Sequence, residues 1–254
     1  MLIENISVVM IAKDAAKSLP KVLDSLKDFK EVVIYENNSV DDTAKIAKSF
    51  SNVKLYQGEF LGFGKTKNKA VSLASNDWVL SLDSDEVLSK EFIENLKTIS
   101  LDSEKVYKIH RKNYYKDKLV KHCWSDDFIV RLFNKNMVSY NDSDVHEKVI
   151  YQGFKSEVLK GEVKHYPYHS IEDFIKKADI YSTLYAKNHT DKKSSSPFKA
   201  FFNATYSFFR TYVLKRGFLD GYVGLVIAVS HAMTNFYKYI KLYELNLEQK
   251  NKKD

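Results

Sequence analysis

The sequence predicts an α/β fold, with a mostly parallel sheet covered by helices on both faces and a helical appendage at the C-terminus. Between residues 6 and 99, short apolar runs rich in β-branched residues alternate with segments of helical periodicity, which is typical of a parallel sheet with crossover helices. From Ser170 onward the periodicity is helical throughout. With 254 residues, the chain is long enough for one large domain with such an appendage.

The first strand is a continuous apolar run at residues 6–11, the pattern of a strand buried on both faces. Helix start signals follow at Ser18, with Pro20 in the first turn and apolar residues at helical spacing after it. This alternation of strand and helix then repeats. Strands are expected at residues 6–11, 31–35, 53–56 and 78–82, and helices at residues 18–26, 43–50, 65–74 and 90–99.

The second half of the chain is less regular. Period-2 runs predict strands at residues 106–111 and 128–133, joined by a basic and aromatic stretch around Trp124. The apolar run at residues 222–233 is about a dozen residues long, well short of the ~20 that a membrane-spanning helix needs. The charged residues 248–254 predict a disordered tail.

Composition limits the partners and the compartment. Lys and Arg number 40 against 33 Asp and Glu, so the formal net charge is +7, which suits nucleic acid, an anionic membrane or a phosphorylated substrate. The single cysteine, Cys123, excludes an internal disulfide and a cysteine-based metal cluster and agrees with a reducing cytosol. No basic region precedes the first apolar run, so the protein is expected to stay on the cytosolic side.

The segment after Pro197 combines many aromatic residues with Lys and Arg. Phe198, Phe201 and Phe202 lie in it, interleaved with cations such as Arg210. This mixture favours an interfacial helix attracted to anionic headgroups. The alternative is a helical pair that packs on the domain or forms a dimer.

Polar residues follow three of the predicted parallel strands. They are Lys13-Asp14, Glu36-Asn37-Asn38 and Asp83-Ser84-Asp85. Ligands bind at the carboxyl ends of the strands in open α/β sheets, so we expect these three loops to converge on one crevice.

Asp83 and Asp85 end the strand expected at residues 78–82. Residues two apart in an extended segment point to the same side, so their carboxylates are expected on one face. Such a pair suits Mg²⁺ or Mn²⁺, which prefer oxygen ligands and share their coordination with substrate phosphates. The alternative is a solvated turn with acidic residues at the start of a helix.

Four motifs, in order along the chain, resemble those of the inverting glycosyltransferases of family 2, whose GT-A fold is a Rossmann-like α/β domain. They are the opening strand and loop at residues 6–14, the loop Glu36-Asn37-Asn38-Ser39-Val40-Asp41-Asp42-Thr43, the helix Gly64-Lys65-Thr66-Lys67-Asn68-Lys69-Ala70 and the stretch Leu82-Asp83-Ser84-Asp85-Glu86. Farther along, residues 124–127, 131–133 and 145–147 resemble the Trp-x-x-Asp, Arg-Leu-Phe and Val-His-Glu of the branch that extends lipopolysaccharide or lipooligosaccharide inner cores.

The sequence departs from the family pattern in the second motif. Glu36 stands where the family usually has Asp, and Asn38 and Asp42 replace glycines. Asn and Asp enter left-handed backbone conformations more readily than most residues, so the loop shape is expected to survive.

The resemblance implies a metal-dependent inverting transfer of a hexose, with UDP-glucose as the expected donor. The acceptor would be a lipopolysaccharide or lipooligosaccharide core or another lipid-linked glycan. Asp127, in the Trp-x-x-Asp motif, is expected to deprotonate the acceptor hydroxyl, with Glu147 as the second candidate. Mn²⁺ or Mg²⁺ would be held by Asp85, together with Asp83 and His146. The residues expected at the nucleotide sugar are Ala12, Asp14, Glu36, Asn38, Lys65, Asp83 and Ser84.

The resemblance also suggests a division of the chain. Residues 1–168 would form the catalytic domain, with a nucleotide-sugar half at 1–100 and an acceptor half at 101–168, and residues 169–247 the helical region. The expected location is the cytoplasmic face of the inner membrane, without nucleic acid as a partner. Two alternatives remain at this point, a non-enzymatic basic membrane adaptor and a sugar nucleotidyltransferase, although the loop after the first strand lacks the glycines that the latter needs.

Overall fold

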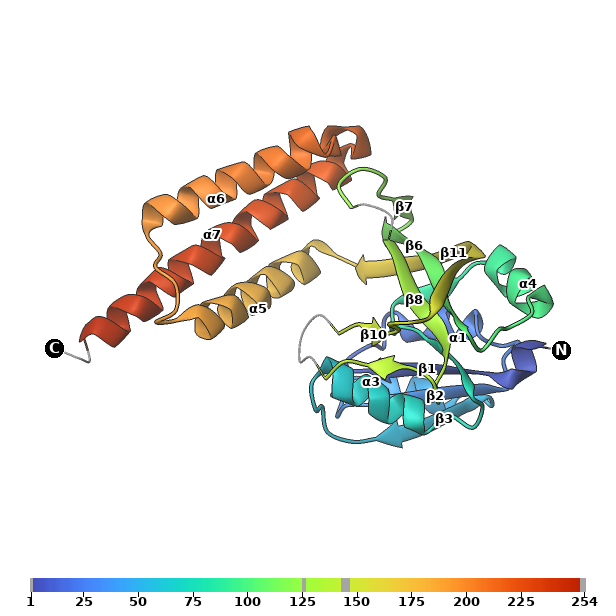
Figure 1. The fold of residues 1–254 in the computed structure, drawn as a ribbon. Coiled ribbons are helices and arrows are strands. Elements are labelled where there is room, and N and C mark those ends of the chain that lie inside the picture. Colours follow the sequence, from blue (N-terminus) through green and yellow to red (C-terminus); the bar gives the residue numbers. More distant parts are fainter. Residues whose placement is uncertain (1, 125–126, 143–146, 252–254) are drawn as a thin grey trace. The chain divides into compact units, whose positions relative to one another are not determined.

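The computed structural model describes residues 2–124, 127–142 and 147–251, which are drawn in Figure 1. The chain forms two compact units. Met1–Lys112 and Asp126–Tyr166 build the first, here called the sheet unit, and Asn113–Ser125 and Pro167–Asp254 build the second, the helical unit. The segment 113–125 thus joins the helices, whereas the sequence suggested that it would belong to the acceptor half of the catalytic domain.

The sheet unit follows the predicted order of elements through α4 and adds short strands. Its elements are η1 Leu2–Asn5, β1 Ile6–Ala12, α1 Leu19–Asp24, β2 Glu31–Glu36, α2 Thr43–Lys48, β3 Val53–Gln57, α3 Phe63–Ser72, β4 Trp78–Ser81, β5 Glu86–Leu88, α4 Lys90–Thr98, β6 Lys105–Tyr115, β8 Asp127–Asn134, β9 Ser139–Tyr140, β10 Val149–Ile150 and β11 Lys155–Tyr168. The last residues of β6 and β11 belong to the helical unit.

The main sheet is parallel in one half and antiparallel in the other. Over the described residues its order is β3-β2-β1-β4-β8-β6-β11-β5. Strands β3, β2, β1 and β4 pair in parallel, as predicted. A crossover helix connects each of these strands to the next of the four along the chain, which allows the parallel pairing. Beyond β4 the pairs β4–β8, β6–β8 and β5–β11 are antiparallel. The α/β class is confirmed, and the sheet is more mixed than the sequence suggested.

Helices cover both faces of the parallel half. Alternate residues of β1 point to opposite faces, so Val8 and Met10 belong to one hydrophobic cluster and Val9 to another. The first cluster contains buried residues of α1, α2 and α4, and the second contains Ala70 and Val71 of α3.

Strand β11 has no counterpart in the predicted elements. Its sequence is polar and contains Gly161 and Pro167, so it lacks the apolar run that marks a strand. Gly161 has φ +86°, and a Cβ there would lie 2.4 Å from the backbone nitrogen of Phe92. The position therefore requires glycine both for its backbone conformation and for the close approach of α4.

The helical unit is organised around a small apolar cluster. Its elements are β7 Lys118–Leu119, α5 Ile171–His189, α6 Pro197–Phe209, the π-helix η2 Arg210–Leu214, the 3₁₀ helix η3 Gly217–Asp220 and α7 Tyr222–Asn251. Ser170 and Asp173 form a capping box at the start of α5. The cluster joins Tyr115 and Cys123 to Phe174 of α5 and Ile227 of α7.

Asp220 anchors the segment 121–123 within the helical unit. Its buried carboxylate accepts hydrogen bonds from the backbone N–H groups of Lys121, His122 and Cys123, at 2.9–3.0 Å. Burial would raise the pKa of Asp220, but these donors and the His122 ring outweigh it, so the pKa lies below its ordinary value. The residue is therefore a structural anchor for the segment 121–123.

Helix α7 extends well past the apolar run that suggested it. It continues to Asn251, so residues 248–251 are helical and the expectation of a disordered tail is wrong for them. The reason is that Leu, Glu, Gln and Lys, which fill this stretch, are all good helix formers. Within the part of the chain that the structure describes, none of the helices is both long and apolar enough to span a bilayer.

Candidate active site

Three loops follow neighbouring parallel strands at the same edge of the sheet, as predicted from the strand order. β1 lies between β2 and β4, so the loops after these strands are adjacent. Two of them are joined directly, since Asp14 accepts a hydrogen bond from the backbone N–H of Val40 at 2.8 Å and donates its own N–H to Ser39 Oγ at 2.9 Å. The third loop, residues 82–85, carries the acidic motif.

Asp83 is held by two buried cations. Lys67 Nζ lies 2.8 Å from its Oδ1, and Arg131 Nη2 donates to its Oδ2. Burial would raise the pKa of Asp83, but the charges of Arg131 and Lys67 outweigh it and hold the pKa well below its ordinary value. For Lys67, burial would lower the pKa, and the carboxylate of Asp83 raises it above the ordinary range. Asp83 and Lys67 are therefore a charged pair at neutral pH.

Glu86 binds the same loop from the protein interior. It is fully buried, accepts from Arg131 at 3.0 Å and from Arg111 at 3.2 Å, and receives the backbone N–H of Asp83 at 3.0 Å. Burial alone would lower the pKa of Arg131, but Asp83 and Glu86 raise it well above its usual value. The arginines and Glu86 therefore fix the backbone of the acidic loop as well as its charge.

The same cations reach the two candidate bases. Arg111 Nη2 lies 2.8 Å from Asp127 Oδ2, and Lys67 Nζ lies 2.7 Å from Glu147 Oε1. Asp127 and Glu147, which are distant from the acidic motif in sequence, are thus each joined to it through one shared cation. The side chain of Asp127 is 38% exposed, against 18% for Glu147, so Asp127 is the more accessible of the two.

Asp85 faces a different environment from Asp83. The chain turns at Ser84 and Asp85, so the expectation of an extended segment with both carboxylates alike is wrong. The carbonyl oxygen of Asp85 accepts the backbone N–H of Tyr166 at 3.0 Å, and its Oδ2 lies 3.5 Å from His165 Nε2. Pairing of the loop with β11 causes this, because β5 begins directly after it at Glu86.

The donor set for a metal is small. His146 lies outside the described residues, and among the described ones no group of three or more His, Cys, Asp or Glu side chains could hold a metal ion. Asp83 is already neutralised by Lys67 and Arg131, which leaves Asp85 with His165 beside it. This set fits Mg²⁺ or Mn²⁺ bound through one carboxylate, with the remaining positions left to water and substrate phosphate, the mode that Mg²⁺ usually adopts.

The residues expected at the nucleotide sugar occupy the three loops or their flanks. Glu36 is buried and accepts from the backbone of Ser39 and from Gln57, so it shapes its own loop. Burial would raise its pKa, but these hydrogen bonds lower it below the ordinary value. Asp14 and Asn38 have φ of +48° and +54°, so Asn38 adopts the left-handed conformation expected of it. Asp42, the other residue that replaces a glycine, has φ −73° and does not.

Ala12, Ser84 and Lys65 differ in accessibility. Ala12 is buried at the end of β1, Ser84 is half-buried in the acidic loop and Lys65 is exposed on α3. Lys67, two residues farther along α3, is the lysine whose ammonium group contacts the acidic loop among the described residues.

Asn68 joins α3 to β9. Its side chain donates to the carbonyl of Tyr140 and accepts from the N–H of Tyr140, both at 2.9 Å, and the Tyr140 hydroxyl donates to Ser81 Oγ at the end of β4. Asn68 therefore fixes the position of β9 against α3. Asp41 and Asp42 begin α2, with Asp42 at the N-cap, as expected for acidic residues at a helix start.

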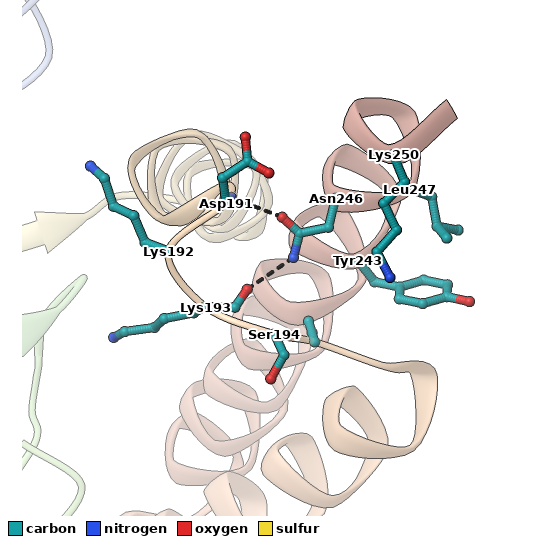
Figure 2. A pocket seen from close by; sticks show the side chains of 9 residues that line it. Asp191, Lys192, Lys193, Ser194, Tyr243, Asn246, Leu247 and Lys250 are labelled. Carbon is teal, nitrogen blue, oxygen red and sulfur yellow. Dashed lines mark hydrogen bonds between the residues drawn. The ribbon is translucent and has the colours of Figure 1, made fainter. Parts of the chain in front are cut away.

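A pocket in the helical unit carries different chemistry. It lies beside the loop from α5 to α6, and Figure 2 shows Asn246 bridging that loop to α7. Asn246 donates to the carbonyl of Lys193 at 2.9 Å and accepts from the N–H of Asp191 at 3.1 Å. Its wall offers lysines and a single carboxylate, so it lacks the paired acids of the sheet unit.

Comparisons with known proteins show the family of this chain. The model of the family described as glycosyl transferase family 2 matches residues 7–152. An uncharacterized glycosyltransferase of Rickettsia conorii is 30% identical over 265 residues, which cover 98% of this chain and 94% of that protein. The lipopolysaccharide core biosynthesis glycosyltransferase LpsC of Rhizobium meliloti is 24% identical over 94% of this chain and 92% of its own length.

Solved structures are more distant. A crystal structure of S. aureus TarS 1-349 is 15% identical and has a TM-score of 0.47, over 98% of this chain and 92% of that one. The family match spans more than half of the chain and contains the acidic loop, both candidate bases and Lys67. The chain therefore belongs to glycosyltransferase family 2 and is a glycosyltransferase, as its motifs suggested.

Proposed function

We propose that the protein transfers a hexose, with inversion, from a nucleoside-diphosphate sugar to a lipopolysaccharide or lipooligosaccharide core or another lipid-linked glycan. The observation that carries this proposal is the pair of cation bridges. Lys67 connects Asp83 to Glu147, and Arg111 connects the acidic loop, through Glu86, to Asp127. Such bridges hold a donor-binding loop and an acceptor-activating carboxylate in one fixed arrangement, which is what a direct displacement needs.

Asp127 is the proposed base. An inverting displacement requires a carboxylate that takes the proton of the acceptor hydroxyl as that oxygen attacks the anomeric carbon. Asp127 is ion-paired through Oδ2 and more exposed than Glu147, so an acceptor can approach it more easily. Arg111 would act as a positioning residue that orients Asp127, and Glu147 remains the second candidate.

Asp85 is the proposed ligand of Mn²⁺ or Mg²⁺, with His165 beside it. His146, which lies outside the described residues, stays a further candidate ligand from its motif alone. When bound, the ion would act as a Lewis acid toward the negative charge that develops on the leaving diphosphate. Asp83, neutralised by two cations, would then serve mainly to keep the loop in shape and to accept a hydrogen bond from the donor.

The donor's nucleoside would lie over the loops after β1 and β2. Ala12 ends β1, and Asp14 and Asn38 stand at left-handed positions whose backbones can approach a ligand closely. Glu36 would contact the nucleotide base, and Ser84 and Lys65 would contact the diphosphate of the donor. UDP-glucose is the donor that we propose to test first.

The relative LpsC supports the proposed acceptor class, because its name assigns it to lipopolysaccharide core biosynthesis and 92% of its length is covered. A lipid-linked acceptor on the cytoplasmic face of the inner membrane would place the enzyme at that surface as a peripheral protein. The basic balance of the chain, +7, also favours a phosphorylated lipid core as partner.

The proposal is tested with the purified full chain, UDP-glucose and other nucleotide sugars, with and without Mn²⁺ or Mg²⁺. Donor binding is measured as protection against thermal unfolding, and transfer as labelled hexose in a lipooligosaccharide core acceptor. We expect Asp85→Asn to lose both signals. Asp127→Asn should keep donor protection and lose transfer by roughly 10²–10⁴-fold, the usual contribution of a general base.

Asp77→Asn is the matched control, because Asp77 precedes β4 at the opposite end from the acidic loop and its side chain accepts a hydrogen bond from Asn136 Nδ2, at 2.8 Å. It should behave as the wild type. Normal turnover by Asp85→Asn would refute the diphosphate site, and normal turnover by Asp127→Asn would move the base to Glu147. Protection by none of the nucleotide sugars would refute the donor class.

A further inference from the structure

Helix α6 carries its large apolar side chains on the outside of the helical unit. Five aromatic side chains are 47–73% exposed, namely Phe198, Phe201, Phe202, Tyr206 and Phe209. Their spacing along the helix places them in one stripe. A stripe of this kind ordinarily faces a protein core, so its exposure needs an explanation.

The face of α6 and η2 toward α7 is instead made of small and polar residues. Ala200 is fully buried, Asn235 Nδ2 donates to Ser207 Oγ at 3.0 Å, and Thr211 Oγ1 lies 3.2 Å from His231 Nδ1. Figure 1 shows α6 and α7 side by side, and the two helices are in extensive contact. The aromatic stripe is therefore not what attaches α6 to the unit.

The exposed apolar surface continues through the turn between the two helices. The side chains there are 43–63% exposed, namely Val213, Leu214, Phe218, Leu219 and Tyr222. The five aromatic rings of α6 alone leave roughly 600 Å² exposed, if a free ring offers about 200 Å². Together with the turn, this exceeds the largest apolar patch of an ordinary monomer, which is about 300–600 Å².

The charges around this surface have one sign. Between Asp191 and Glu244 the sequence has one acidic residue, Asp220, and that residue is 3% exposed and bound to backbone N–H groups. The exposed cations of this segment are Lys192, Lys193, Lys199, Arg210, Lys215 and Arg216. The surface thus combines aromatic rings with cations and lacks an exposed carboxylate within the described segment.

We propose that this surface, which we call the aromatic face, docks on an anionic lipid bilayer with α6 lying in the plane of the headgroups. Phe and Tyr rings insert at that depth, and Lys and Arg bind lipid phosphates. A second copy of the chain is a poorer occupant, because an isologous contact would bring the same cations together. The inference deepens the proposed function, since it names the surface by which the enzyme meets a lipid-linked acceptor.

The test is flotation of the full chain with vesicles of phosphatidylcholine, with and without phosphatidylglycerol, in the absence of donor and acceptor. The wild type should float with the anionic vesicles, and rising salt should weaken its binding. The double variant Phe201→Ser with Phe202→Ser should bind at least about tenfold more weakly, because it removes two half-exposed rings from the interface. Arg210→Glu with Arg216→Glu should lose most of the salt dependence.

The matched control is Ile175→Ser with Ile180→Ser on α5, in the same unit. These side chains are 55% and 53% exposed but lie among charges of both signs, Glu172, Asp173 and Asp179 beside Lys176 and Lys177, so the control should float like the wild type. The inference is overturned if the wild type does not float with the anionic vesicles, or if the Phe variant floats as the wild type does. A concentration-dependent dimer that the Phe variant disperses, without vesicle binding, would overturn it in favour of a second copy.

Failure of the inference and failure of the proposed function are distinguishable. Vesicle binding is measured without nucleotide sugar, and donor protection is measured without lipid. Lost vesicle binding with intact donor protection overturns only the docking surface. Intact vesicle binding without donor protection supports the aromatic face while refuting the proposed donor class.

Discussion

Replacement of Lys67 by Met tests the central contact of the site. The side chain of Lys67 is 4% exposed and lies between Asp83, at 2.8 Å, and Glu147, at 2.7 Å. Met has a similar length without the charge, so the substitution removes one cation from between two carboxylates and leaves the packing nearly unchanged. Removing one partner of a buried pair typically costs about 3–5 kcal/mol.

The lower end of that range applies here. Asp83 keeps Arg131 and is 30% exposed, so water can compensate part of the loss. We therefore expect a loss of about 3 kcal/mol, which lowers the unfolding midpoint by about 6–12 °C for a chain of this size. The assay is thermal unfolding at neutral pH, followed by calorimetry so that the transition of the sheet unit is resolved.

Lys65→Met is the matched control, because Lys65 lies on the same helix and is exposed. Surface substitutions of this kind change stability by less than about 0.5 kcal/mol. A midpoint for Lys67→Met within the range of Lys65→Met would refute the reasoning, since Lys67 would then contribute no more than a solvated lysine. Restoring the charge with Lys67→Arg should recover part of the difference.

The ion pair of Asp83 and Lys67 stabilises the fold over a defined pH range. The folded pKa of Asp83 is depressed, so its stabilisation is present above the unfolded value of ~3.9 and is lost as the pH falls toward the folded value. The folded pKa of Lys67 is raised, so its stabilisation is present below the unfolded value of ~10.4 and is lost as the pH rises toward the folded value. The difference between wild type and Lys67→Met should therefore stay constant from about pH 5 to pH 9.

Three further predictions concern stability. Gly161→Ala should cost about 1–3 kcal/mol more than Gly153→Ala in urea unfolding, because both have positive φ but only the former would press a Cβ against Phe92. Glu31→Gln should unfold about 3 kcal/mol more easily at pH 7, since burial is outweighed by bonds from Lys54, Ser7 and Ser75, which lower the pKa of Glu31 to about 2. That difference should shrink as the pH falls from about 4 to 2, and a constant difference would contradict it. Asp220→Ala should accelerate tryptic cleavage after Lys121, whereas Asp191→Ala should not, and equal rates would remove the anchor role.

The parallel half of the fold could be predicted because its strands are continuous apolar runs. β1 and β2 show such runs, and the loops after them had to meet once the order of helices and strands was known. β11 could not be predicted in this way, because its pairing with β5 is decided by contacts across the chain and its sequence carries a glycine and a proline. The same holds for segment 113–125, whose attachment depends on Asp220 about a hundred positions later.

The acidic residues of the site could be assigned from the sequence, and the roles of its cations could not. Asp83, Asp85, Asp127 and Glu147 were expected at the site from their motifs. Arg131 begins the Arg-Leu-Phe motif but had no assigned role, Arg111 lies within a strand, and both meet Glu86 only in the folded chain. Lys67 offered one usable signal. It shares the buried face of α3 with Ala70 and Val71, at spacings of three and four, while Lys65 does not. A charged lysine on a buried helical face needs a carboxylate partner.

The bridged network has an unequal number of charges. Asp83, Glu86, Asp127 and Glu147 contact Lys67, Arg111 and Arg131, and Asp85 adds a fifth carboxylate in the same loop, so the carboxylates outnumber these cations. A bare nucleotide diphosphate therefore approaches a local excess of like charge, although the protein as a whole is basic. Monovalent salt should screen this repulsion and strengthen binding of the metal-free donor, the opposite of the ordinary salt response of a basic protein to an anion.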